Sequence, residues 1–153
     1  MTEEIPNPYS SNIDVPLKLL QQYRQIAVVG LSADQSRPSY AVTMYMQENG
    51  YEIIPINPRY AGGTILGQRV YATLAEARDA GKVIEIVDVF RRAEYAVPIV
   101  AEAAQVGAKA VWLQLGIKNA EAERKAHESG LVFVQDRCIK VEHRRLLDGF
   151  HIA

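Results

Sequence analysis

The stretch QIAVVGLSADQSRPSY, residues 25–40, decides the fold that the rest of the chain has to fit. It starts with an apolar run, Ile26–Val29, which ends at Gly30, and after a polar loop Pro38 opens a segment with apolar residues at helical spacing. A short apolar run between turn residues is typical of a strand that a parallel sheet buries on both faces. The order strand, turn and helix aims backbone N–H groups and the positive end of a helix dipole at the space above the turn, which favours a phosphate group.

The remaining sequence continues this alternation of strand and helix patterns. Apolar runs predict further strands at residues 52–56, 69–71, 83–90, 109–115 and 131–135. Capping residues and apolar spacing predict helices that begin near residues 15, 38, 74, 93, 120 and 140, with Asp14, Thr73 and Asn119 as caps. Strands that alternate with helices indicate right-handed crossovers and an α/β fold with a doubly wound parallel sheet.

Length and composition limit how many domains the chain can form. With 153 residues, of which 48% are hydrophobic, it fits one globular domain with a complete core and leaves little room for a separate catalytic domain. We therefore expect a single domain over residues 1–153. Its first residues, 1–12, are polar and include Pro6 and Pro8, so we expect them to form a flexible arm.

Charge and cysteine content exclude several classes of partner. Seventeen Lys and Arg residues against 18 Asp and Glu residues give a net charge of −1, which argues against a nucleic-acid partner. No apolar run approaches the roughly 20 residues of a membrane span, and the N-terminus is acidic, so we expect a cytoplasmic protein without membrane contact. Cys138 is the only cysteine and no Cys/His cluster has zinc-like spacing, so we expect no metal site. Cys138 is either a small buried hydrophobe or, alternatively, faces a thiol ligand.

The loops that follow the predicted strands share one property. Ligands of open parallel sheets bind at the edge where the strands end, so residues just after each strand should converge there. Each of these segments carries a basic residue, namely 32–37, 57–59, 90–92, 114–118 and 136–137. The alternative is that loops are polar in general and these cations only face solvent.

The first loop departs from the dinucleotide-binding pattern GxGxxG. Gly30 is present, but Ser32 and Gln35 occupy the positions of the second and third glycines. Ser36 is a candidate cap for the next helix, and Arg37 places a positive charge at the helix N-terminus, where the dipole disfavours it. A bound phosphate would make this charge favourable, whereas without one Arg37 would only face solvent.

The end of the second strand indicates which kind of ribose could bind. An NAD site has Asp or Glu here to bind the ribose hydroxyls, whereas this chain has Asn57, Pro58 and Arg59. A basic residue without a carboxylate favours a ribose that carries a phosphate, either NADP or a nucleotide phosphorylated elsewhere on the ribose.

Other polar and aromatic residues are more ambiguous. Phe90 follows a strand directly and could stack on an adenine, or it could belong to the core. Asp88 lies within an apolar strand and needs a partner, for which Arg91, Arg92 or a backbone donor is available. Gln114 lies at the expected crevice edge as a candidate hydrogen-bonding amide.

No combination of residues predicts catalysis. The three histidines, His127, His143 and His151, fall on predicted helices or in the tail, and none is near a plausible Ser or Cys nucleophile in the sequence. We expect His143 to be a solvated helix residue. The sequence therefore predicts no catalytic residue.

Five segments of the sequence carry a family resemblance, namely IAVVGLSADQSRPSY, IIPINPRYAGGTILGQRVYATLAEA, VIEIVDVFRRAE, AVWLQLGI and VQDRCIKVEHRRL. Over about residues 23–147 the chain resembles the CoA-binding domain family, small stand-alone proteins related to the N-terminal domain of the succinyl-CoA synthetase alpha subunit. The resemblance implies a Rossmann-like three-layer α/β/α fold with strand order 3-2-1-4-5-6 and a short third strand.

The resemblance also implies roles for individual residues. The loop after the first strand would bind the CoA phosphates through Ser32, Ala33, Asp34 and Gln35, with Ser36 and Arg37 adjoining. Arg59 would contact CoA, and the loop after the fifth strand would contribute Leu113, Gln114, Leu115 and Gly116. Two departures are that the first loop has fewer glycines than the synthetase and that the synthetase's phosphorylated histidine lies in a second domain that this chain lacks, so ligase activity is not implied.

These observations lead to the hypothesis that the protein binds coenzyme A or an acyl-CoA at the strand ends without catalysis of its own. The phosphates would lie over residues 32–37, the adenosine near Pro58 and Phe90, and the pantetheine arm past Gln114 and Gly116. Arg59 would face the 3′-phosphate or the pyrophosphate. The expected CoA-binding residues are Gly30, Ser32, Ala33, Asp34, Gln35, Ser36, Arg37, Asn57, Pro58, Arg59, Phe90, Arg91, Leu113, Gln114, Leu115 and Gly116.

Two alternatives stay open. One is an NADP-dependent reductase, which Arg59 favours and the missing glycines disfavour. The other is a subunit that presents CoA to a ligase or acyltransferase partner. The chain could also form a homodimer.

Overall fold

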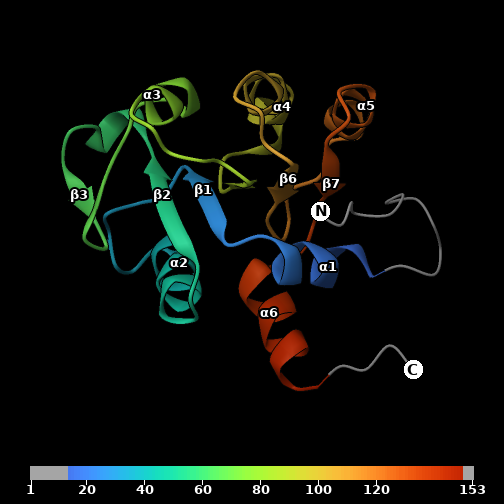
Figure 1. The fold of residues 1–153 in the computed structure, drawn as a ribbon, viewed down its shortest axis with the longest axis horizontal. Helices are drawn as coiled ribbons and strands as arrows, with labels where there is room; N and C mark the ends of the chain where they lie inside the picture. Colours follow the sequence, from blue (N-terminus) through green and yellow to red (C-terminus); the bar gives the residue numbers. More distant parts are fainter. Residues whose placement is uncertain (1–13, 150–153) are drawn as a thin grey trace.

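The computed structural model describes residues 14–149 and shows a parallel five-stranded sheet between two layers of helices (Figure 1). In spatial order the strands are β2 (Glu52–Ile56), β1 (Gln25–Val29), β5 (Ile86–Val89), β6 (Ala110–Leu113) and β7 (Val132–Val134). All four pairings between neighbours are parallel. The predicted α/β fold is therefore confirmed, and all five strands end at one edge of the sheet.

The helices cover both faces of the sheet, as a doubly wound fold requires. One layer contains α1 (Val15–Gln22), α2 (Pro38–Glu48) and α6 (Ile139–Leu147). The opposite layer contains α3 (Leu74–Asp79), α4 (Ala96–Gln105) and α5 (Ala120–Glu128), with a short 3-10 helix, Ala93–Tyr95, before α4. The three-layer arrangement expected from the sequence is the one observed.

The segment expected to form the short third strand pairs with the sheet through only one β-bridge among the described residues. Tyr71 forms a single parallel bridge to Ile56 at the outer side of β2. The residues before it pair with each other instead, in a two-stranded hairpin of β3 (Thr64–Ile65) and β4 (Gln68–Arg69) that follows a 3-10 helix, Pro58–Tyr60. Because the hairpin uses these backbone groups internally, the third position of the sheet is reduced to that bridge.

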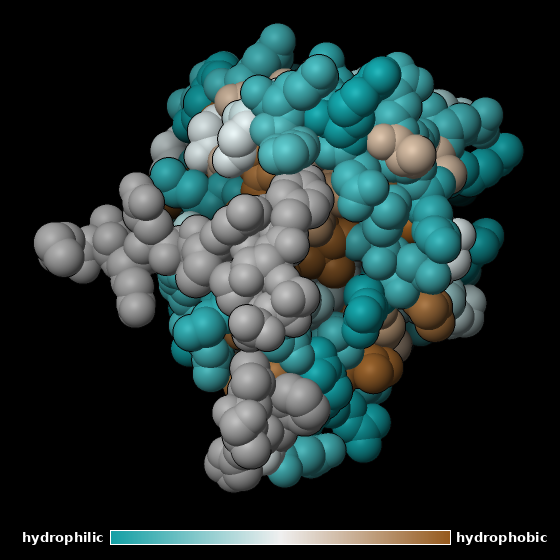
Figure 2. Space-filling model, turned by 90° about the vertical axis from the view of Figure 1, so that its right-hand side faces the viewer, coloured by the Kyte–Doolittle hydropathy of each residue, from teal (hydrophilic) through white to brown (hydrophobic). Residues whose placement is uncertain are grey.

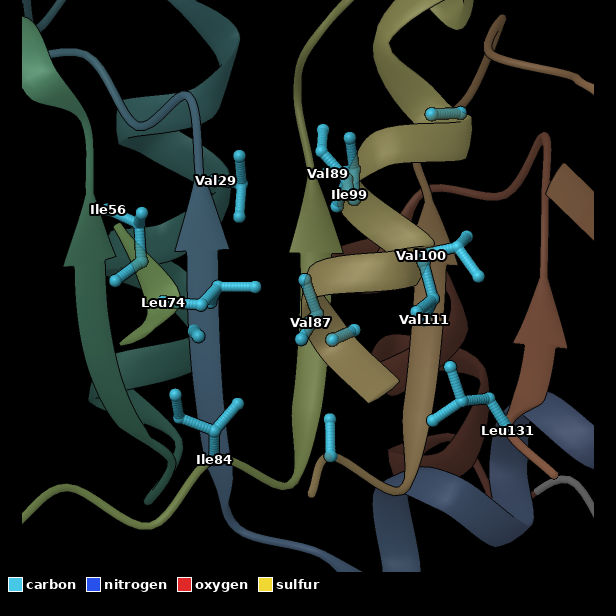
Figure 3. Packing of buried hydrophobic residues seen from close by; sticks show 14 of the residues in the cluster. Val29, Ile56, Leu74, Ile84, Val87, Val89, Ile99, Val100, Val111 and Leu131 are labelled. Atoms are coloured by element: carbon cyan, nitrogen blue, oxygen red, sulfur yellow. The ribbon is translucent and has the colours of Figure 1, made fainter. Parts of the chain in front are cut away.

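Side chains that alternate along the strands build a core on each face of the sheet. Ala27 and Val29 point to the α3–α5 layer, and Ile26 and Val28 point to the opposite layer. Figure 3 shows the first of these cores, in which side chains of four strands meet α4. Each fully buried Val, Leu or Ile side chain stabilises the fold by about 1.5–3 kcal/mol relative to exposure. The strands that carry the loops of the sheet edge are therefore fixed from both sides.

Helix caps follow the sequence in three places and differ in one. The predicted caps Asp14, Thr73 and Asn119 each accept a hydrogen bond from a backbone N–H in the first turn of their helix. Ser36 does not cap α2, because Arg37 occupies the cap position and no side chain bonds to that end of the helix. The prediction for Ser36 was wrong because its hydroxyl donates to Asp34 instead.

His143 is buried, contrary to the prediction of a solvated helix residue. It lies on α6, the helix that packs against α2 and α1, and only 5% of it is exposed. Its Nδ1 is 2.9 Å from the hydroxyl of Tyr45 on α2, and burial lowers the pKa of the imidazole. A single helix pattern could not show that α6 is covered on this side.

The surface gives no sign of a membrane-spanning segment. Among residues 14–149, no helix is both long and apolar enough to cross a lipid bilayer. The face seen from the right-hand side of Figure 1 is largely hydrophilic outside its grey atoms, with small separate apolar areas (Figure 2). The flexible arm expected at residues 1–12 lies outside the described residues.

Candidate functional site

A cleft of about 370 Å³ opens where β1 and β2 end. We call it the β1–β2 cleft, and its lining residues are Gly30, Ser32, Arg37, Pro38, Ser39, Asn57, Arg59, Tyr60 and Phe90. Six of these belong to the expected binding set, namely Gly30, Ser32, Arg37, Asn57, Arg59 and Phe90. The structure thus brings residues from three separate strand ends to one hollow.

Gly30 is the residue that lets the chain turn at the floor of this cleft. Its φ is +88°, in the left-handed region that favours glycine. A Cβ atom there would also lie 3.0 Å from Cδ of Arg91. The position therefore favours glycine for its backbone conformation, and a larger residue would also have to displace the Arg91 side chain.

Side chains of the loop between β1 and α2, and of the first turn of α2, fix the conformation of this loop by hydrogen bonds. The hydroxyl of Ser39 accepts a hydrogen bond from the Ser32 N–H at 3.1 Å, and the Ser32 hydroxyl accepts one from the Asp34 N–H at 3.0 Å. The Asp34 carboxylate accepts bonds from the hydroxyl and the N–H of Ser36, which lower its pKa. The N–H groups of Ala33 and Gln35 donate to no residue among 14–149. Two backbone donors of a fixed loop are thus free for an anion.

Two arginines contribute positive charge to the cleft without being tied down. Nε of Arg37 is 3.9 Å from Asp34 Oδ2, and both side chains are more than half exposed, so the pair is weak. The Arg59 guanidinium lies 5.6 Å from the centre of the Tyr60 ring, and no carboxylate among the described residues pairs with it. Both side chains can therefore turn toward a bound anion.

Asn57 positions the cleft rather than lining it with free groups. Its Nδ2 donates to the Leu31 carbonyl at 3.0 Å, and its Oδ1 accepts from the Arg59 N–H at 3.0 Å. The side chain thereby joins the end of β2 to the loop after β1. Both the nitrogen and the oxygen of its amide bond to the protein, so its role in the site is structural.

The ends of β5 and β6 are closed, in contrast to the expectation for Gln114. This side chain is buried, donates through Nε2 to Asp88 Oδ1, and accepts from the Ile139 N–H at 3.3 Å. The amide therefore faces the interior and not the crevice edge. Leu113 is also fully buried, which leaves Leu115, 70% exposed, and Gly116 as the accessible residues of this loop.

Asp88 bonds to a backbone donor, one of the partners that the sequence offered, and to Gln114, which the sequence did not offer. Its carboxylate bonds to Gln114 and to the Val89 N–H rather than to Arg91 or Arg92. Burial raises the pKa of this carboxyl from 3.8 to about 7, because the hydrogen bonds only partly offset the loss of solvent. The nearest arginines in the sequence are engaged elsewhere.

The cations of the other loops do not join the cleft. Arg92 pairs with Glu94 at 3.6 Å, and Arg137 pairs with the buried Glu142 at 3.3 Å. Arg91 lies over the Tyr95 ring, with its guanidinium carbon 4.3 Å from the ring centre. Convergence of positive charge is thus limited to the β1 and β2 ends and Arg91 beside them.

A second, smaller cavity of about 190 Å³ adjoins the cleft on the α4 side of the sheet. We call it the α4 cavity, and its lining residues are Val29, Ile56, Pro58, Ala72, Thr73, Leu74, Arg91, Tyr95, Pro98, Ile99 and Glu102. Figure 3 shows Val29 and Ile56 at the ends of β1 and β2, with Ile99 on α4. The cavity has an apolar floor and a rim with charged groups.

Sequence reasoning missed several lining residues of both hollows. Tyr60 directly follows Arg59, which was in the expected binding set. An aromatic side chain so close to a strand end could have indicated that it lines the site. Ser39 had no such signal, because its hydroxyl bonds to a loop residue seven positions earlier. Tyr95 and Glu102 lie on the helical segment after β5, and the sequence does not show which helix face meets the sheet edge.

The described residues offer no metal centre. Among residues 14–149, no group of three or more His, Cys, Asp or Glu side chains could hold a metal ion. Cys138 is half-buried at the N-cap of α6, so it is less enclosed than expected for a core residue.

Comparisons with known proteins point to one family. A family model described as a CoA binding domain matches residues 24–144. A Bacillus subtilis protein, "Uncharacterized protein YneT", is 39% identical over 137 residues, which is 90% of this chain and 96% of that protein. A hypothetical protein from Pyrococcus horikoshii is similar in structure, with a TM-score of 0.82 and 36% identity, over 96% of this chain and 99% of that chain.

A more distant similarity concerns the fold alone. A dinucleotide-forming acetyl-coenzyme A synthetase from Ca. Korarchaeum cryptofilum, solved with phosphate and ADP, has a TM-score of 0.63 at 20% identity. The match covers 78% of this chain and 27% of that chain. The same layered sheet is thus one part of a much larger enzyme.

Proposed function

Because this chain belongs to the CoA binding domain family, we propose that it binds coenzyme A or an acyl-CoA in the β1–β2 cleft without catalysing a reaction itself. The observation that carries the proposal is the meeting of Arg37 and Arg59 in one cleft of about 370 Å³, beside a loop in which the N–H groups of Ala33 and Gln35 bond to no residue among 14–149.

The cleft suits phosphate groups for electrostatic reasons. The N-terminus of α2, an eleven-residue helix, carries the positive end of its dipole and begins at Pro38, which has no N–H to satisfy. The amides of Ala33 and Gln35 add two donors, and hydrogen bonds from charged or backbone donors to an anion are strong where water is partly excluded. A pyrophosphate over this loop would also replace Asp34 as the partner of Arg37.

The second arginine favours a further phosphate on the same ligand. Arg59 lies at the end of β2, the strand end at which a carboxylate would bind unmodified ribose hydroxyls. Coenzyme A carries a 3′-phosphate on its ribose, and we place that phosphate at Arg59. The adenosine would then lie near Pro58 and Phe90, and the pantetheine arm would leave past Leu115 and Gly116, since Gln114 faces inward.

The proposal is tested by calorimetric titration of the purified protein with CoA, dephospho-CoA and NADPH. We expect saturable binding of CoA, weaker binding of dephospho-CoA, and no comparable binding of NADPH. No saturation at millimolar CoA would overturn the proposal, and preferential binding of NADPH would favour a reductase. Incubation of acetyl-CoA with the protein, followed by free-thiol detection, tests the absence of hydrolysis.

A further inference from the structure

The α4 cavity adjoins the β1–β2 cleft through two pairs of consecutive residues. Pro58 lines the cavity while its neighbour Arg59 lines the cleft, and Arg91 lines the cavity while its neighbour Phe90 lines the cleft. A ligand group in the cavity therefore lies next to residues whose neighbours in the chain face the cleft. We infer that the cavity receives the adenine base of the bound nucleotide and that Glu102 selects it by accepting a hydrogen bond from its exocyclic amine.

The position of the cavity decides which part of the ligand could enter it. This inference rests on the proposed function, in which the phosphates occupy the cleft. In coenzyme A the base and the phosphates share one ribose, whereas the thiol and any acyl group lie at the far end of the pantetheine arm. A hollow that begins beside Arg59, where the 3′-phosphate is placed, is therefore within reach of the base on the same ribose.

The size and lining of the cavity fit a flat apolar ring. Its volume of about 190 Å³ is below the roughly 300–1,000 Å³ of sites that enclose a whole drug-sized ligand, so it can hold one ring system. Val29, Ile56 and Ile99 form an apolar floor. Two further groups, Tyr95 and the Arg91 guanidinium stacked on it, offer planar surfaces for a base.

Glu102 is the polar group that could read the edge of that base. Its Oε1 accepts the N–H of Leu74 at 2.8 Å, which fixes the carboxylate between α4 and α3. Its Oε2 accepts no hydrogen bond from residues 14–149. This oxygen of the half-buried carboxylate is therefore available to accept a hydrogen bond, and the 6-amino group of adenine is a donor.

The test compares two nucleotides that differ only in that amine. The probes are adenosine 3′,5′-bisphosphate, which is the end of CoA without its arm, and purine riboside 3′,5′-bisphosphate, which lacks the 6-amino group. We expect the protein to bind the adenosine form at least about tenfold more tightly, since a hydrogen bond to a charged group is worth about 1.5–3 kcal/mol.

The variant Glu102→Gln turns this into a test of the single residue. Its Oε1 can still accept from Leu74 N–H, and this leaves its Nε2 donor facing the cavity and the adenine amine. We expect the affinity for the adenosine probe to fall about tenfold, while the affinity for the purine riboside probe should stay within about twofold of the wild-type value. Glu94→Gln is the matched control, because Glu94 pairs with Arg92 outside both hollows, and it should change neither affinity.

Each other outcome decides a separate point. If the protein binds neither CoA nor either bisphosphate, the proposed function fails. If it binds CoA but does not discriminate the two bisphosphates, the inference fails and CoA binding stands. If discrimination survives in Glu102→Gln with an unchanged melting temperature, another group reads the base and the role of Glu102 is overturned.

Discussion

The two halves of the sheet edge have the same topology and opposite chemistry. At the ends of β1 and β2, the arginines are exposed, two backbone donors lack an acceptor among the described residues, and a cleft separates the loops. At the ends of β5, β6 and β7, Asp88 and Gln114 bond to each other, the Gly116 N–H donates to Asp136, and the Trp112 Nε1–H donates to the Arg137 carbonyl. The first half therefore leaves polar groups available to a ligand, whereas the second half uses its polar groups to hold the sheet together.

The difference shows that strand order alone does not make a site. Parallel topology brings every strand end to one edge, but α6 packs its N-terminus against the β5–β6 half and consumes the polar groups there. At the β1–β2 half the N-terminus of α2 lines the cleft instead, and no side chain caps it. The predictions that follow test this division between a closed half and an open half.

The largest expected effect comes from the pH dependence of Asp88. Its pKa is about 7 in the folded protein and near 3.8 when exposed, a difference of about three pKa units or about 4 kcal/mol. Between pH 4 and pH 7 the folded protein holds this proton and the unfolded chain has released it. The contribution of Asp88 to the free energy of unfolding therefore falls as the pH rises through this window and levels off above it.

Urea unfolding of the wild type and of Asp88→Asn across pH 4–8 measures this effect. We expect the difference in free energy of unfolding between the two proteins to change by a few kcal/mol over the window, since the amide does not titrate. A difference that stays constant with pH would show that Asp88 is ionised in the folded protein and that the closed half is more polar than inferred.

The next effect concerns the partner of that carboxyl. Gln114→Leu leaves Asp88 without its side-chain donor and the Ile139 N–H without its acceptor. At pH 8 we expect a loss of about 3 kcal/mol in the free energy of unfolding, and a smaller loss at pH 5, where Asp88 is protonated.

A double variant separates the loss of a partner from the loss of packing. Asp88→Val combined with Gln114→Leu removes both polar groups, so it should recover part of the stability that the single change loses. If the double variant loses more free energy of unfolding than Asp88→Val and Gln114→Leu lose together as single variants, the two side chains do more for the closed half than bond to each other.

The architecture could be predicted from the sequence because the patterns that indicate it are local. The apolar run before Gly30, the caps at Asp14, Thr73 and Asn119, and the strand–helix alternation each depend on neighbouring residues. The topology rule then placed Arg59 correctly at the cleft. These steps need no knowledge of which helix packs on which loop.

Other features were out of reach because they depend on packing between distant segments. Gln114 could be placed at the strand end, but the Ile139 N–H that turns it inward is 25 residues away. His143 looked solvated until α2 and Tyr45 covered it, 98 residues earlier in the chain. To place Glu102 at the cavity one must know which face of α4 is turned toward the sheet, and the sequence of α4 does not determine this.

A smaller expected effect tests the open half. Arg59→Glu should weaken CoA binding by about 10- to 150-fold, because it removes hydrogen bonds to a phosphate worth about 1.5–3 kcal/mol. The loss should be smaller for dephospho-CoA if Arg59 meets the 3′-phosphate. Calorimetry measures both affinities.

The control for that change is Arg92→Glu in the same set of loops. Arg92 is 83% exposed and pairs with Glu94, outside the lining of both hollows. Its reversal alters the net charge equally, so CoA affinity should stay within about twofold. Equal losses for the two variants would mean that overall charge, and not the cleft, attracts the ligand.

The smallest expected effect lies at the far end of the closed half. Asp136 has φ +58°, in the left-handed region, and its Oδ1 accepts the Gly116 N–H at 2.8 Å. Asp136→Ala loses this bond and keeps a backbone conformation that alanine disfavours, so we expect a loss of about 1–2 kcal/mol in the free energy of unfolding. Asp136→Asn retains both the acceptor and the tolerance of that conformation, so its stability should match the wild type. Since Asp136 is remote from β1 and β2, the affinity for adenosine 3′,5′-bisphosphate should not change in either variant. A lower affinity for this bisphosphate would show that the two halves of the edge are coupled.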